Sequence, residues 1–269
     1  MPAFKQEAAL HFPWAVVTGD APLVAAAVHN GHAVRDELKP YLGLSDAERL
    51  REEDPFTGGW TGVAPNQIIG NRSRFEVDLN RPPDKAVYLK PEDAWGLDVW
   101  KEPLPDDLVA RSLAQHTAFY HEVGELLHDL ARRHGKFVVF DLHSYNHRRE
   151  GADGPPADPD ANPEVNIGTR TLDRERWAPV VERFMTDLRS FDFSGRQLDV
   201  RENVKFQGGY FPQWVHETFP ESGCALAIEF KKIFMDEWTG EPDRRQVEVI
   251  HAALESTVPG VLEVLQQVR

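Results

Sequence analysis

The sequence contains a single cysteine, Cys224, among 269 residues. One cysteine excludes an internal disulfide bond and any metal site built from several thiolates, and this usage is typical of a cytoplasmic protein. Long apolar runs are also missing, since none approaches the roughly 18–20 residues that span a bilayer. Residues 1–14 (MPAFKQEAALHFPW) contain no basic segment followed by an apolar stretch. We therefore expect no signal peptide and a cytoplasmic location.

Positive charge is scarce as well. The chain has 30 Lys and Arg residues against 44 Asp and Glu residues, which gives a formal net charge of −14 at pH 7. Nucleic-acid backbones and anionic membranes attract positively charged surfaces, so we expect neither as a partner. The length suits a single domain over residues 1–269 with a substantial core, and it leaves the oligomeric state open.

Short apolar runs alternate with longer helical patterns along the chain. The apolar runs predict strands at residues 23–28, 75–79, 137–142, 164–167, 197–200 and 224–230. Periodic apolar positions predict helices at residues 106–134, 177–190 and 245–268. Strands that alternate with helices predict an α/β fold in which a mixed, mostly parallel sheet carries helices on both faces.

Two stretches rich in Gly, Pro, Asp and Asn predict long loops, at residues 52–71 and 149–163. Loops of this length are uncommon inside a compact domain and are often active-site segments. The second loop is either a mobile lid over such a site or a plain solvated excursion.

Polar side chains stand at the ends of four predicted strands. His29 follows the first strand, Asn80 and Arg81 follow the second, His143 follows the third, and Glu229 is next to last in the sixth. Because the carboxyl ends of parallel strands meet at one edge of a sheet, we expect these side chains to gather there. Glu229 stands out, since an ionised carboxylate in a buried strand is costly unless it is paired.

This set of residue types is typical of metal-assisted hydrolysis. Two imidazoles and one carboxylate are common ligands of a catalytic zinc ion, which lowers the pKa of water towards about 7. A separate carboxylate can accept the proton, and an arginine can hold a substrate carboxylate or stabilise an oxyanion. The pattern indicates an amide-bond hydrolase with an anionic substrate.

Two other classes of function compete with this interpretation. The same ligand types accept Mn, Fe or Co, so a non-haem iron oxygenase is one alternative. A wide separation between His29 and the nearest acidic cluster, within an α/β pattern, disfavours it. The other alternative is a binding protein without turnover, which the presence of His29, His143 and Glu229 disfavours.

Five segments, taken in order, resemble the N-formylglutamate amidohydrolases: HNGH, SRFEVDLNRP, DLHSYNHRR, ENVKFQGGY and AIEFKKIFMDEWTGE. That family is distantly related to the zinc carboxypeptidases, which share a His, an Asn-Arg pair, a second His and a Glu in this order. The resemblance implies a zinc-carboxypeptidase-like fold and the hydrolysis of N-formyl-L-glutamate to L-glutamate and formate. An amidase or carboxypeptidase for another small acidic peptide or N-acyl amino acid is the alternative on the same scaffold.

The resemblance also implies which residues bind a metal. His29 and His143 would bind zinc, or another divalent metal, with an acidic residue from the intervening segment as the third ligand. Asp54 is the favoured third ligand, and Glu53 is the alternative. His147 would contact the substrate or support the ligands, or it is a plain surface histidine.

The remaining roles concern the substrate. Glu229 matches the general base, which accepts a proton from the attacking water and passes it to the leaving amine. Arg74 would polarise the scissile carbonyl, and Arg81, helped by Asn80, would bind the α-carboxylate. Lys205 would meet a side-chain carboxylate. The expected partner is thus a small anionic N-acyl amino acid.

Overall fold

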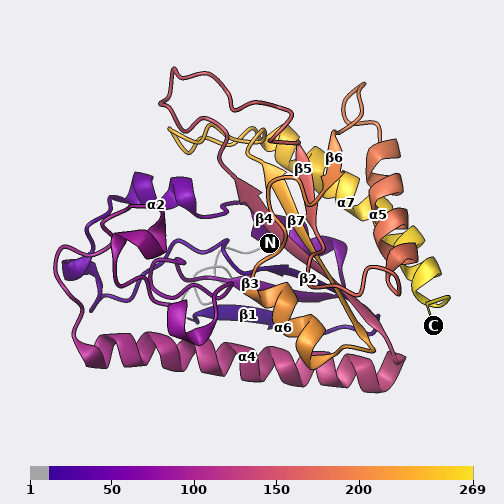
Figure 1. Ribbon diagram of the computed structural model, residues 1–269, viewed down its shortest axis with the longest axis horizontal. Helices are drawn as coiled ribbons and strands as arrows, with labels where there is room; N and C mark the ends of the chain where they lie inside the picture. Colours follow the sequence, from indigo (N-terminus) through magenta and orange to yellow (C-terminus); the bar gives the residue numbers. More distant parts are fainter. Residues whose placement is uncertain (1–11, 269) are drawn as a thin grey trace, which may run out of the picture.

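A seven-stranded β-sheet runs through the computed structural model, which describes residues 12–268 (Figure 1). The strands are β1 (Trp14–Val17), β2 (Leu23–Ala27), β3 (Asn66–Gly70), β4 (Phe137–Tyr145), β5 (Val165–Gly168), β6 (Val200–Glu202) and β7 (Gly223–Lys231). Their order across the sheet is β1-β3-β2-β4-β7-β5-β6. The central strands β3, β2, β4 and β7 are parallel, whereas β1 and β5 run antiparallel to their neighbours β3 and β7.

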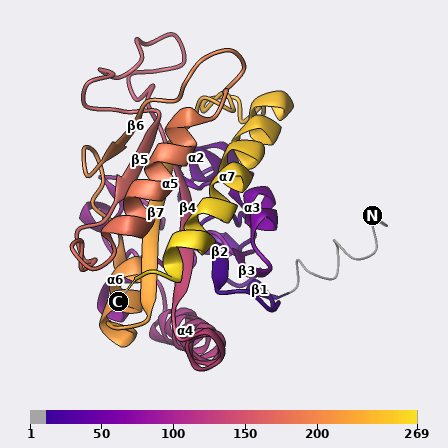
Figure 2. The same ribbon diagram turned by 90° about the vertical axis from the view of Figure 1, so that its right-hand side faces the viewer.

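Helices cover both faces of this sheet. They are α2 (Asp46–Glu52), α3 (Thr57–Trp60), α4 (Asp106–His134), α5 (Ala178–Ser190), α6 (Tyr210–Thr218) and α7 (Arg244–Leu265), with 3-10 turns η1 (Lys39–Tyr41), η2 (Thr61–Val63), η3 (Pro83–Lys85) and η4 (Pro91–Ala94). The helices α5 and α7 lie side by side on one face, and α4 and α6 lie towards the other (Figures 1 and 2). The predicted α/β fold with a mixed sheet is confirmed. Within residues 12–268, no helix combines the length and the apolar character needed to cross a bilayer.

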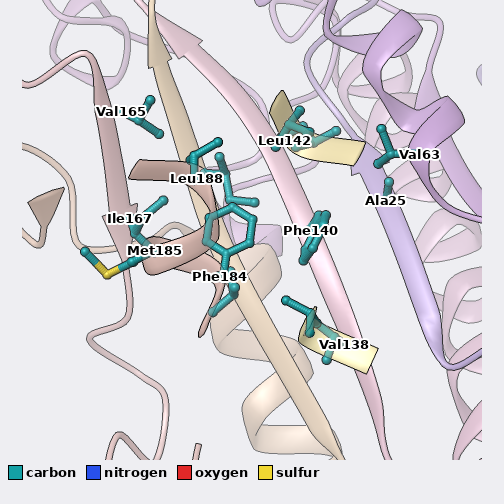
Figure 3. Packing of buried hydrophobic residues seen from close by; sticks show 14 of the residues in the cluster. Ala25, Val63, Val138, Phe140, Leu142, Val165, Ile167, Phe184, Met185 and Leu188 are labelled. Atoms are coloured by element: carbon teal, nitrogen blue, oxygen red, sulfur yellow. The ribbon is translucent and has the colours of Figure 1, made fainter. Parts of the chain in front are cut away.

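Side chains of the central strand β4 alternate between the two faces of the sheet and pack into the core on each side. Val138, Phe140 and Leu142 belong to the core beneath α5 and α7, where they pack among side chains of α5 (Figure 3). Phe137 and Val139 point the opposite way, into the core beneath α4 and α6. Each buried side chain of this size stabilises the fold by about 2 kcal/mol. All nine residues of β4 are buried, so its polar members near the carboxyl end also lie in the interior.

The long helix α4 matches its predicted bounds residue for residue. Pro105 precedes it with a φ of −55°, and Asp106 and Asp107 place negative charge in the first turn, where the helix dipole favours it. Gly135 follows the last residue with a φ of 77°, which a residue with a side chain adopts only under strain. The predictions for α5 and α7 are confirmed to within one to three residues at each end.

Three predictions about the sheet and its loops are wrong or incomplete. Residues 75–79 form turns instead of a strand: the carbonyl of Ser73 accepts a hydrogen bond from the amide of Glu76 (2.9 Å). Apolar residues are buried there by packing, and a five-residue run does not distinguish a strand from a buried turn. The predicted loop 52–71 contains α3 and β3, and the predicted strand 197–200 coincides with β6 only at Val200. Residues 149–163 contain neither helix nor strand, as predicted.

A histidine fastens α6 to the sheet. His216 Nε2 accepts a hydrogen bond from the backbone amide of Ala225 in β7 (3.0 Å), and its Nδ1 lies 2.8 Å from the hydroxyl of Thr171. Burial lowers the pKa of His216 to about 4. A histidine in the unfolded chain titrates near pH 6.5, so the unfolded state binds the proton first as the pH falls. Stability is therefore full above about pH 6.5 and is lost as the pH falls towards 4.

We expect the substitution His216→Gln to reduce this pH dependence, because glutamine keeps an acceptor for the Ala225 amide and does not titrate. Between pH 7 and pH 4.5, the wild type should lose roughly 2 kcal/mol more unfolding free energy than the variant, after a discount for partial exposure. Urea unfolding at both pH values measures the difference. The exposed helix residue His121, changed to Gln, is the matched control and should keep the wild-type dependence. An equal loss in wild type and H216Q would contradict the prediction.

Candidate active site

The carboxyl ends of β2, β4 and β7 meet at a cavity of about 820 Å³. His29 lies two positions after β2, and His143 lies near the end of β4 directly beside Glu229 of β7 in the strand register. Neighbouring strands are about 4.8 Å apart and side chains paired in register point to the same face, so His143 and Glu229 share one wall of the cavity. Asn80 and Arg81 also line it, although they arrive from a turn instead of a strand.

His29, Asp54 and His143 form a buried group that could hold a metal ion. One donor atom from each residue lies within 4.8 Å of the others. The Nδ1 atoms of both histidines face the same oxygen of Asp54, at 3.4 Å for His29 and 2.9 Å for His143. Asp54 lies in the turn after α2, and its backbone amide donates to the carbonyl of His29 (3.0 Å). A loop residue thereby completes a site whose other two members follow the sheet.

Two further carboxylates hold the outer nitrogens of these histidines. Nε2 of His29 lies 2.6 Å from Asp78 Oδ1, and Nε2 of His143 lies 2.9 Å from Asp141 Oδ1. A carboxylate at the far nitrogen fixes the ring and the tautomer, which leaves the near nitrogen, here Nδ1, available to bind a metal. The second oxygen of Asp141 is buried and has no hydrogen-bond partner among residues 12–268.

The acidic ligand is held in its ionised form. Burial on its own would raise the pKa of Asp54, but hydrogen bonds from His143 and His29 outweigh it and lower that pKa below its usual range. Two imidazoles and one ionised carboxylate are a donor set suited to a divalent ion such as zinc. The residues present therefore fit the metal that the family resemblance implies.

Glu53, the alternative third ligand, is directed elsewhere. Its Oε2 lies 2.6 Å from His32 Nδ1, the hydroxyl of Ser73 donates to its Oε1, and Arg49 is 3.6 Å away. This buried cluster lies outside the cavity lining. Of the two neighbouring acids, the structure brings Asp54 together with the two histidines.

Glu229 lines the cavity without a partner for its carboxyl group. No hydrogen bond or ion pair to this carboxyl group occurs within the described part of the chain. The burial of Glu229 is therefore not explained by an ion pair with the neighbouring Lys231 or Lys232. Burial raises the pKa of Glu229 to about 8, and the nearby His143 opposes the shift. A carboxyl group that titrates near neutral pH is suited to accept and return a proton.

Two arginines line the cavity, and their side chains differ in how closely other residues hold them. Arg74 donates to Asp78 Oδ2 (2.7 Å), and its guanidinium lies 4.8 Å from the centre of the Trp95 ring. Burial opposes its charge, but the Asp78 carboxylate raises the pKa of Arg74 well above its usual value. The side chain of Arg81 is 35% exposed, and its Nε is 4.0 Å from Asp78 Oδ2. Arg81 is therefore the freer of the two to meet an anion.

Asn80 connects the site to α6. Its Oδ1 accepts a hydrogen bond from the backbone amide of Phe211 (2.8 Å), and its Nδ2 lies 3.4 Å from His143 Nε2. Gly209 packs so closely that a Cβ there would lie 2.3 Å from Asn80 Nδ2. Glycine at this position is thus required by close approach. The sequence analysis missed α6, and the glycine pair before its aromatic first turn was the available signal.

Two predicted substrate-binding residues do not line the cavity. Lys205 donates from Nζ to Asn162 and lies 5.3 Å from the ring centre of Tyr145. His147 Nδ1 lies 3.1 Å from Glu237 Oε1. The structure does not bring Lys205 or His147 to the cavity with the other predicted site residues.

Three cationic residues in the cavity lining were not singled out from the sequence. They are Arg149, Arg170 and Lys232. Arg170 follows β5 by two positions, and Lys232 follows β7 directly. The place of Arg170 and Lys232 just after strand ends, the same signal that located the histidines, could have found these two.

Comparisons of structure agree with this architecture. An N-formylglutamate amidohydrolase from Ralstonia eutropha JMP134 has a TM-score of 0.71 at 17% identity, covering 96% of this chain and 98% of the other. A gene product from Agrobacterium tumefaciens has a TM-score of 0.64 at 16% identity, covering 94% and 98%. At these identities the likeness shows the shared fold alone.

Comparisons of sequence place the chain more specifically. No curated protein matches it in sequence. The family profile described as N-formylglutamate amidohydrolase, in contrast, matches residues 21–235, which include every strand from β2 to β7 and all the proposed metal ligands. Because this match extends over most of the sequence, the chain belongs to the N-formylglutamate amidohydrolase family.

Proposed function

We propose that this protein hydrolyses the amide bond of an N-acyl amino acid, with N-formyl-L-glutamate as the first candidate, and that it uses a divalent metal held by His29, Asp54 and His143. Family membership supports the class of reaction. The observation that carries the proposal is the carboxyl group of Glu229, which faces the same cavity as the three proposed ligands and has no partner among the described residues.

The chain's own residues then account for proton transfer and charge. A divalent metal in this site would activate a water molecule and polarise the acyl carbonyl. Glu229 accepts the proton of the attacking water and returns it to the leaving amine, which is general base and then general acid catalysis by one group. Arg74, held by Asp78 and Trp95 at the cavity wall, stabilises the negative charge that develops on the carbonyl oxygen.

The cavity also supplies positive charge for the substrate. Arg81 is the proposed contact for the α-carboxylate, with Asn80 beside it. Arg149 and Arg170 line the same cavity and are the proposed partners of a side-chain carboxylate, since Lys205 is engaged elsewhere. Charge of this kind acts locally, because salt screens longer-range attraction and the chain as a whole carries −14.

The proposal is tested by formate release from the purified protein supplied with zinc. N-formyl-L-glutamate should release formate, and a chelator should abolish the reaction. N-formyl derivatives of neutral amino acids should release formate much more slowly, and N-acetyl-L-glutamate, followed by the glutamate it releases, should also react much more slowly. Release from the neutral derivatives at an equal rate would contradict the acidic substrate. Turnover of an acidic dipeptide, without formate from any formyl derivative, would favour a carboxypeptidase on this scaffold.

The metal ligands are tested by comparing Asp54→Asn with Glu53→Gln. Asp54→Asn removes a proposed ligand's charge and should weaken zinc affinity at least about tenfold. Glu53→Gln should leave zinc affinity close to that of the wild type, although its buried contacts with His32 and Arg49 make it less stable. Zinc affinity is measured by competition with a chelating dye, and circular dichroism checks the fold. If zinc affinity fell more in Glu53→Gln than in Asp54→Asn, Glu53 and not Asp54 would be the third ligand.

The proton acceptor is tested by Glu229→Gln, which keeps the shape of the side chain and removes its basicity. We expect kcat to fall by roughly 10²- to 10⁴-fold, while zinc content and KM change little. The exposed residue Glu217 of α6, changed to Gln, is the matched control and should keep full activity. If E229Q turns over at the wild-type rate, Glu229 is not the proton acceptor.

A further inference from the structure

Asp54 lies in a turn outside the sheet. Asp54 follows the carboxyl end of α2, which closes at Glu53. Its backbone amide donates to the carbonyl of His29, and its carbonyl accepts from the hydroxyl (2.6 Å) and the backbone amide (3.4 Å) of Thr57. The carboxylate itself accepts a hydrogen bond from the hydroxyl of Ser144 (3.2 Å), and the chain reaches Asp54 directly from the end of α2, so what holds that end also bears on where the carboxylate lies.

Lys232 holds that end. Its Nζ donates to the backbone carbonyls of Arg51 and Glu53, at 2.8 Å for the latter. Its backbone amide donates to the carbonyl of Tyr145 at the end of β4 (3.0 Å). Lys232 thus connects the last turn of α2 to the strand that carries His143, and it does so one residue before Asp54.

The burial of this lysine is unusual for a charged group. Lys232 is 1% exposed, and no carboxylate within residues 12–268 comes within ion-pair distance of its ammonium. A buried cation without a carboxylate partner is costly, and its own pKa is lowered by burial to about 8. The carbonyl oxygens at a helix carboxyl end carry partial negative charge and lack partners in the helix, so they offset part of that cost.

A lysine that only stabilised the fold would not need to line the cavity. Lys232 lines the cavity together with Asp54 and Glu229, and the negative charge of Asp54 acts on it. Its neighbour Lys231 ends β7, donates its backbone amide to the carbonyl of Glu164 (2.9 Å) and is absent from the cavity lining. Two adjacent lysines therefore have distinct surroundings, and one of them belongs to the site.

We propose that Lys232 is a positioning residue for the metal site: its ammonium group fixes the end of α2 so that the carboxylate of Asp54 faces His29 and His143. This inference rests on the proposed function, because it concerns the same ligand set. Lys232 acts on Asp54 through the backbone of Glu53, and it does not itself bind the metal or the substrate.

The test measures metal binding in three variants. Lys232→Met removes the ammonium group, Lys232→Gln keeps a hydrogen-bond donor without charge, and Lys231→Met is the matched control. Cobalt(II) is titrated into each metal-free protein, and the visible absorption bands report the ligand geometry. Zinc affinity is measured by competition with a chelating dye, and urea unfolding monitors the fold.

We expect K232M to bind both metals about 10- to 100-fold more weakly than the wild type, the range typical of residues that orient metal ligands. Its cobalt(II) bands should shift, because Asp54 no longer approaches in the same direction. K232Q should be intermediate, and K231M should stay within about twofold of the wild type. With metal at saturation, KM should change little, since Lys232 does not contact the substrate.

Several results would overturn the inference. Wild-type cobalt(II) affinity and bands in both Lys232 variants would show that Asp54 needs no such support. A raised KM with unchanged metal binding would make Lys232 a substrate contact. Failure of both K232M and K232Q to fold, while K231M folds, would assign it to stability alone. If the wild type binds no cobalt(II), the proposed function itself fails, and that outcome is distinct because it appears before any substitution.

Discussion

The parallel pairing of β4 with β7 is the constraint on which the site depends. The two strands pair without interruption over nine positions, from Phe137 with Gly223 to Tyr145 with Lys231. Because side chains alternate, one face of both strands packs under α5 and α7 over most of its length. The other face packs under α4 and α6 only near its beginning and then turns polar. A shift of the register by one residue would turn His143 or Glu229 into the apolar core.

Several of the buried carboxyl groups around the cavity have no positively charged side chain in the described chain to balance them. The carboxyl groups of Asp78 and Asp141 contact the histidines, and Asp54 and Glu229 line the cavity between them. Arg74 compensates Asp78 directly. The remaining carboxyl groups have no permanent cation in contact, which is an environment that favours binding of a positive ion. The proposed metal site thus follows from the charge balance of the interior as well as from the geometry of three donor atoms.

The sequence was most informative where the signal is local. The helix α4 could be predicted from its apolar period and its flanking Pro105 and Gly135, and the residues after the strands could be predicted to gather at one edge. It was least informative for β3, whose sequence NQIIG contains only two apolar residues, and for residues 75–79, which are apolar yet form turns. In both places long-range packing, not local preference, decides the conformation.

In the candidate site, too, some residues could be predicted from the sequence and others could not. His143 and Glu229 lie in strands and His29 lies just after one, so their convergence could be expected from topology. The choice between Glu53 and Asp54 could not, because two adjacent acids in a turn point in different directions, and contacts with segments distant in sequence, His32 for Glu53 and His143 for Asp54, distinguish them. Lys205 matches the family pattern by sequence position and His147 follows His143 by four residues, but neither residue lines the cavity.

The close approach of Gly209 to Asn80 has a consequence for how such a protein can evolve. Position 209 has no space for even one methyl group, and Asn80 stands between it and His143. A larger residue at position 209 would displace Asn80, and Asn80 in turn contacts His143 of the proposed metal site. Arg149 and Arg170 stand on exposed segments of the cavity rim, where a change of side chain disturbs no such packing. Substitutions at the rim are therefore tolerated more easily than substitutions at Gly209, where close packing allows only glycine.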